Sequence, residues 1–388
     1  MSFDLSKDQL AIREAMTKLC ADFTADYWLD CDNEGRFPQE FVDAIAAGGW
    51  LGIAMPEAYG GSGLGITEAA IMLQAVTESG AGFTGASAIH LNVFGLNPVV
   101  VFGTDEQQQR MLPPMISGKN TACFGVTEPN AGLDTLSIET RADRTDDGYV
   151  VNGQKHWTSM AQRADKILLL ARTTPKDQVK KRTHGLSLFF TDFNRDYIEV
   201  REIAKMGRKA VDSNAVFFDN LPIPQNDLIG EEGKGFHYIL HGLNPERILL
   251  AAESVGLGRV ALRRACDYAK ERVVFNRPIG QNQGIQHPLA KCWIDLEAAD
   301  LLARNAAALY DAERECGAQA NAAKYFAAEA GFHACEQAVL TLGGMGYAKE
   351  YHVERYMREM MIPRIAPVSR EMILNYISER VLGLPRSY

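Results

Sequence analysis

The chain has 388 residues, enough for two or three domains that each bury a hydrophobic core. Apolar residues make up 46% and charged residues 23% of it, the composition of an ordinary globular protein, which excludes disordered and fibrous classes. Lys and Arg total 40 against 49 Asp and Glu, and the resulting net charge of −9 argues against a nucleic acid or an anionic membrane as partner.

The cysteines and the apolar runs indicate a cellular compartment. The seven cysteines are scattered and form no CxxC pair, which is typical of reduced thiols in a cytoplasm. No apolar run approaches the roughly 20 residues that span a bilayer, and the start MSFDLSKDQL lacks the basic and apolar parts of a signal peptide. We therefore expect a cytoplasmic protein without membrane insertion.

The first hundred residues are predicted to be mostly helical. Ser6 can cap a helix whose apolar residues recur every three or four positions, and PQEFVDAIAAGGW predicts a second helix that ends at a glycine pair. After the loop EAYGGSGLG, Thr67 opens another helix that runs to Val76. Because this glycine-rich loop follows no strand, we interpret it as a connector rather than as a phosphate-binding loop.

Between about Thr121 and Leu228 the pattern predicts strands. Runs rich in β-branched and aromatic residues alternate with turn residues, as in GYVVNGQKHWTS, DKILLLART, GLSLFFTDF and NAVFFDNLPIP, which favours an antiparallel sheet or barrel. Long helical stretches return from about Gly235. The order helical, β, helical argues against a doubly wound dinucleotide fold, in which strands and helices alternate.

Simple catalytic motifs are missing from the sequence. There is no HExxH, no His/Cys cluster and no Asp-rich loop, so we expect no metal, and no GxSxG motif indicates a serine nucleophile. The eight histidines are isolated from one another, which favours structural roles for them.

Three longer segments carry a specific signal. They are FGVTEPNAGLDTLSI (124–138), ERVVFNRPIGQNQGIQ (271–286) and LTLGGMGYAKEYHVERYMRE (340–359). With PEAYGGSGLG before them and KMGRKAVDSNAVFFDNLPIPQNDLIGEEGKGF between the first and the second, they make the whole chain resemble the acyl-CoA dehydrogenase family.

The resemblance implies an α+β multidomain fold. An N-terminal α-helical domain would span residues 1–120, a middle antiparallel β-domain 121–232 and a C-terminal four-helix bundle 233–388. Family members of this kind assemble as a homotetramer, a dimer of dimers, with FAD where the domains meet.

The resemblance also implies which residues hold the FAD. From the middle domain, the flavin would be lined by Phe124, Val126, Thr127, Gly132, Leu133, Trp157, Thr158 and Ser159. The pyrophosphate and adenosine would be held from the neighbouring subunit by Arg272, Phe275, Gln283, Leu340, Gly343 and Gly344, with Ser369 completing the set. The chemistry agrees, since a reduced flavin needs hydrogen-bond donors and an apolar wall, and a guanidinium offers a fork of donors to phosphate. Two positions depart from the family, because Leu133 stands at a usual serine and Leu340 at a usual glutamine.

The implied reaction converts a fatty acyl-CoA into a trans-2-enoyl-CoA, as in fatty acid β-oxidation. A carboxylate removes the α-proton, the β-hydrogen passes as hydride to the flavin, and the electrons continue to an electron-transfer flavoprotein. Most relatives carry the carboxylate in a Tyr-Glu-Gly-Thr run, but the matching residues here are 366–369, with Pro367 at the glutamate. A minority, which includes the isovaleryl-CoA and long-chain enzymes, carries it at the start of the first bundle helix, where this chain has Glu246 before Arg247.

Glu246 also has a purely structural interpretation. Asn244 resembles an N-cap and Pro245 a first helical residue, and a glutamate in the first turn is favoured by the helix dipole alone. The missing carboxylate at Pro367 favours Glu246 as the base, with Asn244, Arg247 and Leu133 contacting the substrate. Since proline has no N–H, we expect the amide of Val368 or Ala366 to replace the donor that normally holds the thioester oxygen.

Two other functions stay open at this point. A relative of the same fold could run a different flavin reaction, as an acyl-CoA oxidase, a flavin monooxygenase or an acyl-CoA desulfinase, and Pro367 and Leu133 favour this alternative. A catalytically inactive flavin or acyl-CoA binding subunit is the second, and the presence of Glu246, Arg272 and Trp157 argues against it. The base on the bundle helix is compatible with branched or long acyl chains, whose length the sequence does not fix.

Overall fold

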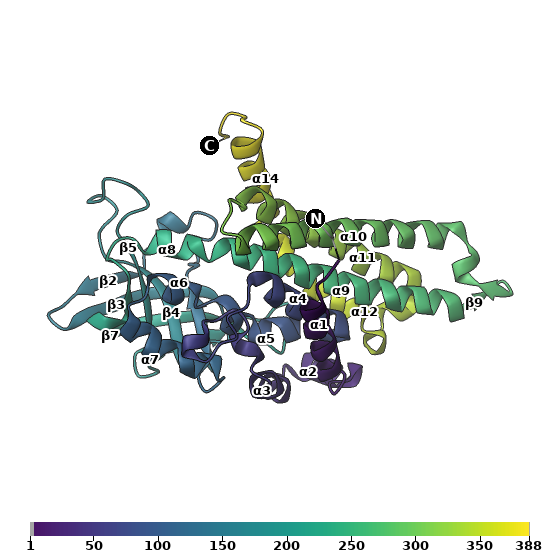
Figure 1. Ribbon diagram of the computed structural model, residues 1–388, viewed down its shortest axis with the longest axis horizontal. Coiled ribbons are helices and arrows are strands. Elements are labelled where there is room, and N and C mark those ends of the chain that lie inside the picture. Colours follow the sequence, from purple (N-terminus) through teal and green to yellow (C-terminus); the bar gives the residue numbers. More distant parts are fainter. Residues whose placement is uncertain (1–3, 388) are drawn as a thin grey trace.

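The computed structural model describes residues 4–387 and builds a helical, a β and a second helical region in chain order (Figure 1). This order confirms the expected fold class. Ser6 caps the first helix as predicted, because its hydroxyl accepts from the Gln9 N–H at 3.2 Å while the Gln9 side chain accepts from the Ser6 N–H at 3.0 Å. The helices of the N-terminal region are α1 (Lys7–Cys20), α2 (Ala25–Glu34), α3 (Gln39–Ala47), α4 (Ile66–Val76), α5 (Gly82–Phe94), α6 (Asn97–Phe102) and α7 (Asp105–Ile116).

The middle region is one twisted sheet with strand order β6-β7-β3-β2-β4-β5-β8, and β1 pairs with β4 beside this path. The long ladders β3–β7 and β4–β5 are antiparallel, as expected, whereas β1 runs parallel to β4 and β2 meets β4 in one parallel pairing. The four strands expected from the sequence correspond to β3, β4, β5 and β7. The strands are β1 (Ala122–Gly125), β2 (Arg141–Arg144), β3 (Gly148–Ser159), β4 (Lys166–Arg172), β5 (Leu186–Asp192), β6 (Ile198–Glu202), β7 (Ser213–Pro224) and β8 (Leu228–Ile229).

Three long helices dominate the C-terminal region. Helices α9 and α11 are parallel to each other, and α10 is antiparallel to both (Figure 1). The hairpin β9–β10 joins α9 to α10 at the end of the bundle far from the sheet. The shorter helices α12 to α14 make up the remainder of the bundle. The elements are α8 (Gly235–His241), α9 (Leu243–Glu271), β9 (Val273–Val274), β10 (Arg277–Pro278), α10 (Gln283–Asp311), α11 (Gly317–Leu342), α12 (Val353–Glu359), α13 (Ile362–Ile365) and α14 (Arg370–Tyr376).

The two helical regions share one hydrophobic core, in which α4 and α5 pack against α9. The stretch 66–102, which holds α4, α5 and α6, is long and apolar enough, by length and composition, to cross a membrane, with a mean hydropathy of 1.4 in its most apolar window. Since 61% of that window is buried inside the protein, the stretch serves here as core helices.

A kink between α4 and α5 fixes the direction of α5. Gly80 and Gly82 both have positive φ, and a Cβ on Gly82 would lie 2.5 Å from the Glu359 carboxylate, so the backbone approaches α12 too closely for a side chain. Arg355 donates to the Gly80 carbonyl at 2.6 Å, and the Thr84 hydroxyl donates to Glu359 at 2.7 Å. The fully buried Arg355–Glu359 pair thus clamps the start of α5.

Candidate functional site

The end of β3 carries a bulge that turns an aromatic side chain outward. The pairing of β3 with β7 shifts register between Lys155 and Thr158, and Trp157 within this irregular stretch has φ 62°. A bulky residue in the left-handed region is strained, and its side chain is 54% exposed rather than packed in the core. The bulge therefore leaves the Trp157 side chain exposed at the C-terminal end of β3.

The segment after β1 lies beside this bulge. The His156 N–H donates to the Thr127 carbonyl at 2.8 Å, so the structure brings Thr127 beside the strand residue that precedes Trp157. Phe124 and Val126 are half-buried against the core of the middle region. These residues form the first of the predicted groups.

A buried ion pair holds that segment in place. Lys155 on β3 donates to the Glu128 carboxylate at 2.8 Å and to the Val126 carbonyl at 3.0 Å, and Glu128 also accepts from the N–H groups of Glu139 and Thr140 at 2.6 and 2.9 Å. Burial would raise the pKa of Glu128, but these partners hold it below the ordinary value. This ion pair was not predicted from the sequence. The available signal was Lys155, a charged residue within a predicted strand.

Arg208 connects the end of β3 to α5. Its guanidinium donates to the hydroxyls of Ser159 and Ser87 at 3.0 Å each and to that of Ser213 at 3.3 Å. Ser87 lies on α5, three residues before His90, so the two side chains share one face of the helix. The bulge of β3 is thereby coupled to the helix that packs on α9.

His90 continues this connection to α9. Its Nδ1 lies 2.6 Å from the carboxylate of Glu253, which is 1% exposed. Burial disfavours the charged imidazole, but the Glu253 carboxylate outweighs burial and raises the pKa of His90 above its ordinary value. Glu253 follows Glu246 by two turns of α9, so the His90–Glu253 pair lies on the side of this helix that carries the predicted base.

The structure places Glu246 in an environment that suits a proton acceptor. Burial raises the pKa of its carboxyl above the ordinary value of 4.5, against the opposing charges of His90, Arg247 and Lys324. Within residues 4–387, no hydrogen bond is made to the Glu246 carboxylate. A carboxylate that is poised by burial and not committed to a partner can take up a proton.

The capping interpretation of Glu246 is wrong in its details. Helix α9 begins at Leu243, directly after α8 and the αR residue Gly242, so Asn244 and Pro245 lie inside the helix rather than at its boundary. The Glu246 N–H already donates to the Gly242 carbonyl at 3.2 Å. The Asn244 side chain instead accepts from Arg247 at 3.0 Å, while the buried Nε of Arg247 has no partner among the described residues. Two of the three predicted substrate contacts, Asn244 and Arg247, thus lie one turn apart beside Glu246, whereas Leu133 lies in the middle region.

The loop 366–369, where relatives have their glutamate, lies close to this end of α9. The Ala366 N–H donates to the Ile362 carbonyl at 2.9 Å at the C-terminal end of α13, whereas the Val368 N–H has no hydrogen-bond partner among the described residues. Pro367 is exposed. The Ser369 hydroxyl accepts from the Met372 N–H at 3.3 Å, which gives this residue an N-capping role for α14.

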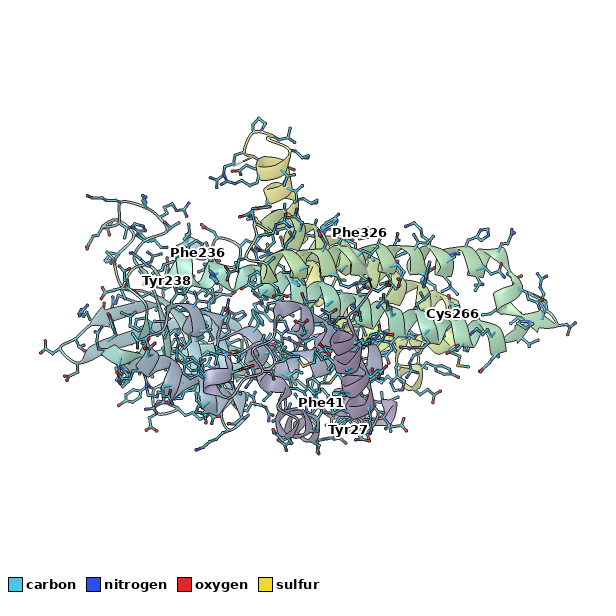
Figure 2. The ribbon with its side chains drawn as sticks, in the orientation of Figure 1. Tyr27, Phe41, Phe236, Tyr238, Cys266 and Phe326 are labelled. Carbon is cyan, nitrogen blue, oxygen red and sulfur yellow. The ribbon has the colours of Figure 1, made fainter. Side chains whose placement is uncertain are left out.

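The second predicted group lies at the other end of the bundle. Arg272 follows the last turn of α9, about 40 Å from Glu246 at a rise of roughly 1.5 Å per residue. Figure 1 shows β9 at the tip remote from the sheet, and Figure 2 places Tyr238 of α8 and Cys266 of α9 toward opposite ends of this axis. Within one chain the structure does not bring the second group to Trp157. Its members at this end are Arg272, Phe275, Gln283, Leu340, Gly343 and Gly344.

The residues at the C-terminal end of β3 fit a flavin. The Thr158 hydroxyl is buried and has no hydrogen-bond partner in the part of the chain that the structure describes, so it has a donor to spare. A Cβ on Gly132 would meet nothing within 4 Å, and Leu133 and Trp157 offer exposed apolar surface. At the far tip, Phe275 is 93% exposed, and a Cβ added at Gly343 or Gly344 would meet no atom within 4 Å. No group of three or more His, Cys, Asp or Glu side chains among residues 4–387 is arranged to hold a metal ion.

Comparison with known proteins agrees with this geometry. Sequence models of the acyl-CoA dehydrogenase N-terminal, middle and C-terminal domains match residues 6–119, 123–221 and 233–382. The acyl-CoA dehydrogenase fadE12 of Mycobacterium bovis is 39% identical over 100% of this chain and 99% of its own length. The caffeyl-CoA reductase-Etf complex subunit CarC of Acetobacterium woodii is 33% identical over 89% of this chain and 91% of its own.

A solved structure gives the same result for the fold. Butyryl-CoA dehydrogenase from Megasphaera elsdenii superposes with a TM-score of 0.93 at 29% identity, covering 98% of this chain and all of that one. With the helical, β, helical order, the exposed apolar side chains of Leu133 and Trp157 and the uncommitted carboxylate on α9, these matches leave one assignment. The chain belongs to the acyl-CoA dehydrogenase family of FAD-dependent oxidoreductases.

Proposed function

We propose that this enzyme dehydrogenates a fatty acyl-CoA, including branched or long chains, to the trans-2-enoyl-CoA, with Glu246 as the base that removes the α-proton. The observation that carries the proposal is the Glu246 carboxylate, which has a pKa raised by burial and no hydrogen bond within the described residues. A base in this state takes up a proton more readily than an ordinary exposed carboxylate does.

The residues at and beside the C-terminal end of β3 would hold the flavin. Trp157 would cover one face of its ring, the Thr158 hydroxyl would donate to it, and Gly132 and Leu133 would border it. When bound, FAD accepts the β-hydrogen of the substrate as hydride. Arg208 and His90 then contribute by fixing the position of this edge relative to α9.

The substrate would be oriented by groups next to the base. Arg247 and Asn244 are joined at 3.0 Å and lie within one turn of Glu246, so they can contact the polar part of an acyl-CoA. We assign the Val368 N–H as the donor to the thioester oxygen, because the alternative amide of Ala366 is already bonded to Ile362. Such a donor stabilises the enolate that forms when the α-proton leaves.

The tip of the bundle would serve a neighbouring subunit in a dimer of dimers. Arg272 lies about 40 Å along α9 from Glu246, and a helix rises roughly 1.5 Å per residue, so one FAD cannot contact both within a chain. The exposed Phe275 and the open Gly343 and Gly344 support binding of the adenosine half from a second copy. On this proposal Arg272→Ala weakens FAD retention and assembly together, which gel filtration and flavin absorbance of the purified protein measure.

The electron acceptor and the location follow from related features. The relative CarC is named as a subunit of a complex with an Etf, which supports an electron-transfer flavoprotein as the acceptor here. The seven cysteines are all free, and reduced thiols support a cytoplasmic location.

Anaerobic mixing of the purified holoenzyme with acyl-CoAs of different length and branching tests the function. We expect the flavin absorbance to bleach with at least one of them and mass spectrometry to find a product lighter by two hydrogens. Reoxidation by an electron-transfer flavoprotein faster than by dioxygen supports the dehydrogenase, whereas fast reoxidation by dioxygen supports an oxidase. A holoenzyme that no acyl-CoA bleaches contradicts the proposal.

A further inference from the structure

Lys324 is a fully buried cation near the start of α11. Its side chain is 1% exposed, and its ammonium donates to the Val368 carbonyl at 2.6 Å. An ammonium has three donors and is strongly hydrated in water, so burying one requires compensating partners. The one hydrogen bond ties α11 to the loop that carries Pro367 and the Val368 amide.

Two further contacts attach the same loop to α11. Arg364 in α13 donates to the Glu329 carboxylate at 2.9 and 3.1 Å, and Arg370 at the start of α14 donates to it at 3.3 and 3.4 Å. Both ends of the segment 364–370 therefore converge on one carboxylate of α11, five residues beyond Lys324. The loop is held from one helix at three points.

The same ammonium acts on the proposed base. Helices α9 and α11 pack side by side in the same direction, Glu246 lies in the first turn of α9 and Lys324 in the second turn of α11. Burial, together with the charge of Arg247, lowers the pKa of Lys324 to about 8, so the group is mostly charged at neutral pH. The charged groups around Glu246 are His90 on α5, Arg247 and Glu253 on α9 and Lys324 on α11, and those around Lys324 also include Glu329 and Glu371.

We propose that Lys324 is a positioning residue of the active site, whose buried ammonium holds the loop 366–369 against α11 and keeps Glu246 in the carboxylate form that accepts the α-proton. This inference rests on the proposed role of Glu246. An opposite charge favours ionisation of a carboxyl group, whereas burial opposes it. Without the ammonium, burial acts on Glu246 with less opposition, so a larger share of the enzyme carries a protonated and inactive base at a given pH.

The test compares Lys324→Met, Lys324→Arg and Glu329→Gln as holoenzymes. The rate of flavin reduction by a saturating acyl-CoA is measured anaerobically over the pH range in which each variant keeps its FAD. Lys324→Met removes the charge, Lys324→Arg keeps it, and Glu329→Gln weakens the attachment of the loop while leaving the ammonium in place. Lys349→Met, which removes an exposed lysine bonded to Asn33 at 2.7 Å, is the surface control and keeps the wild-type profile.

We expect Lys324→Met to move the acidic limb of the pH–rate profile to higher pH. At pH values below the limb the rate should fall about tenfold for each pH unit of this shift, and at pH values above the limb it should change little. Lys324→Arg should restore the limb, and Glu329→Gln should change KM or the maximal rate without moving it. An acidic limb unmoved in Lys324→Met overturns the inference. A shift of the same size in Glu329→Gln also overturns it, because loop geometry then explains the effect.

A second readout does not depend on activity. The infrared band of the protonated carboxyl, taken as the difference between each protein and its Glu246→Gln counterpart, reports the titration of Glu246 directly. We expect this titration to move to higher pH in Lys324→Met, and an unchanged titration contradicts the inference. If Glu246→Gln itself leaves flavin reduction intact, the proposed base is wrong, which is distinguishable from a wrong role for Lys324.

Discussion

The middle region and the bundle each contain a buried lysine near a glutamate, but the pKa of the glutamate is lowered in the middle region and raised in the bundle. Lys155 and Lys324 are both at most 1% exposed, and burial lowers the pKa of each to about 8. Lys155 contacts the Glu128 carboxylate directly at 2.8 Å, whereas Lys324 contacts a backbone carbonyl and acts on Glu246 through its charge alone.

This difference in hydrogen bonding distinguishes a glutamate that stabilises the fold from one that can take part in proton transfer. Glu128 accepts hydrogen bonds from Lys155, Glu139 and Thr140, and its pKa is lowered, so it stays a carboxylate and holds the backbone around it. Glu246 accepts no hydrogen bond within residues 4–387, and its pKa is raised. A satisfied carboxylate is fixed in charge and place, while an unsatisfied one can change its protonation state.

The largest expected effect concerns the rate. Glu246→Gln keeps the shape of the side chain but cannot accept a proton, so we expect flavin reduction to slow by roughly 10²- to 10⁴-fold with FAD retained. Stopped-flow absorbance of the holoenzyme measures it. Glu371→Gln, which changes an exposed carboxylate a few residues beyond Pro367, should keep the rate. Loss of the rate in Glu371→Gln, but not in Glu246→Gln, would assign the base to α14.

The next effect concerns stability. Lys155→Met leaves the Glu128 carboxylate buried without its main partner, and breaking such a pair costs about 3–5 kcal/mol. Lys324→Met leaves only a carbonyl unpaired, which costs about 1–3 kcal/mol. Denaturant unfolding of both holoenzymes, with FAD in excess, measures the difference. Equal losses in the free energy of unfolding would show that the two lysines contribute equally to stability.

A smaller effect depends on pH and has opposite signs at the two glutamates. Because the folded pKa of Glu128 is lowered, it adds stability above the ordinary value of 4.5 that is lost as pH falls through the folded pKa. Because the folded pKa of Glu246 is raised, its ionisation removes stability as pH rises from the ordinary value through the folded pKa.

Glu246→Gln should therefore stabilise the protein at neutral pH, with a gain that disappears as the pH falls toward the ordinary pKa of the carboxyl. Glu128→Gln should destabilise it at neutral pH, with a loss that shrinks in acid. Melting temperatures of the two variants and the wild type between about pH 3 and about pH 8 measure both trends. A destabilised Glu246→Gln at neutral pH would mean that the Glu246 carboxylate is satisfied.

The smallest expected effect concerns two buried threonines, one with a hydrogen-bond partner and one without. Thr158 is buried with a hydroxyl that lacks a partner among the described residues, whereas the buried Thr191 donates to Asp227 at 2.7 Å. Thr158→Val should weaken FAD binding about 2- to 10-fold, the value of one neutral hydrogen bond, and leave the apoprotein as stable as before. Thr191→Val should cost about 1–3 kcal/mol of stability and keep the FAD affinity. Flavin fluorescence titration and unfolding of the apoproteins measure the two, and a reversed pattern contradicts the assignment of Thr158 to the flavin.

Local features of the site were predictable from the sequence, whereas its environment was not. Glu246 could be named because the glutamate position of most relatives holds Pro367. The helix boundary beside it was misplaced, because Pro245 resembles a first helical residue although α8 continues almost directly into α9. His90 was assigned a structural role, since its partner Glu253 is 163 residues away in the chain.

The sequence by itself determined the order of the three regions, the limits of β3 and the cap at Ser6, because hydrophobic period, turn residues and capping boxes act within a few residues of chain. The tertiary structure alone decided that β1 joins β4 in parallel, that a bulge turns Trp157 outward, and which charges surround Glu246. These outcomes depend on packing between segments far apart in the chain, where burial and opposing charges set both conformation and pKa.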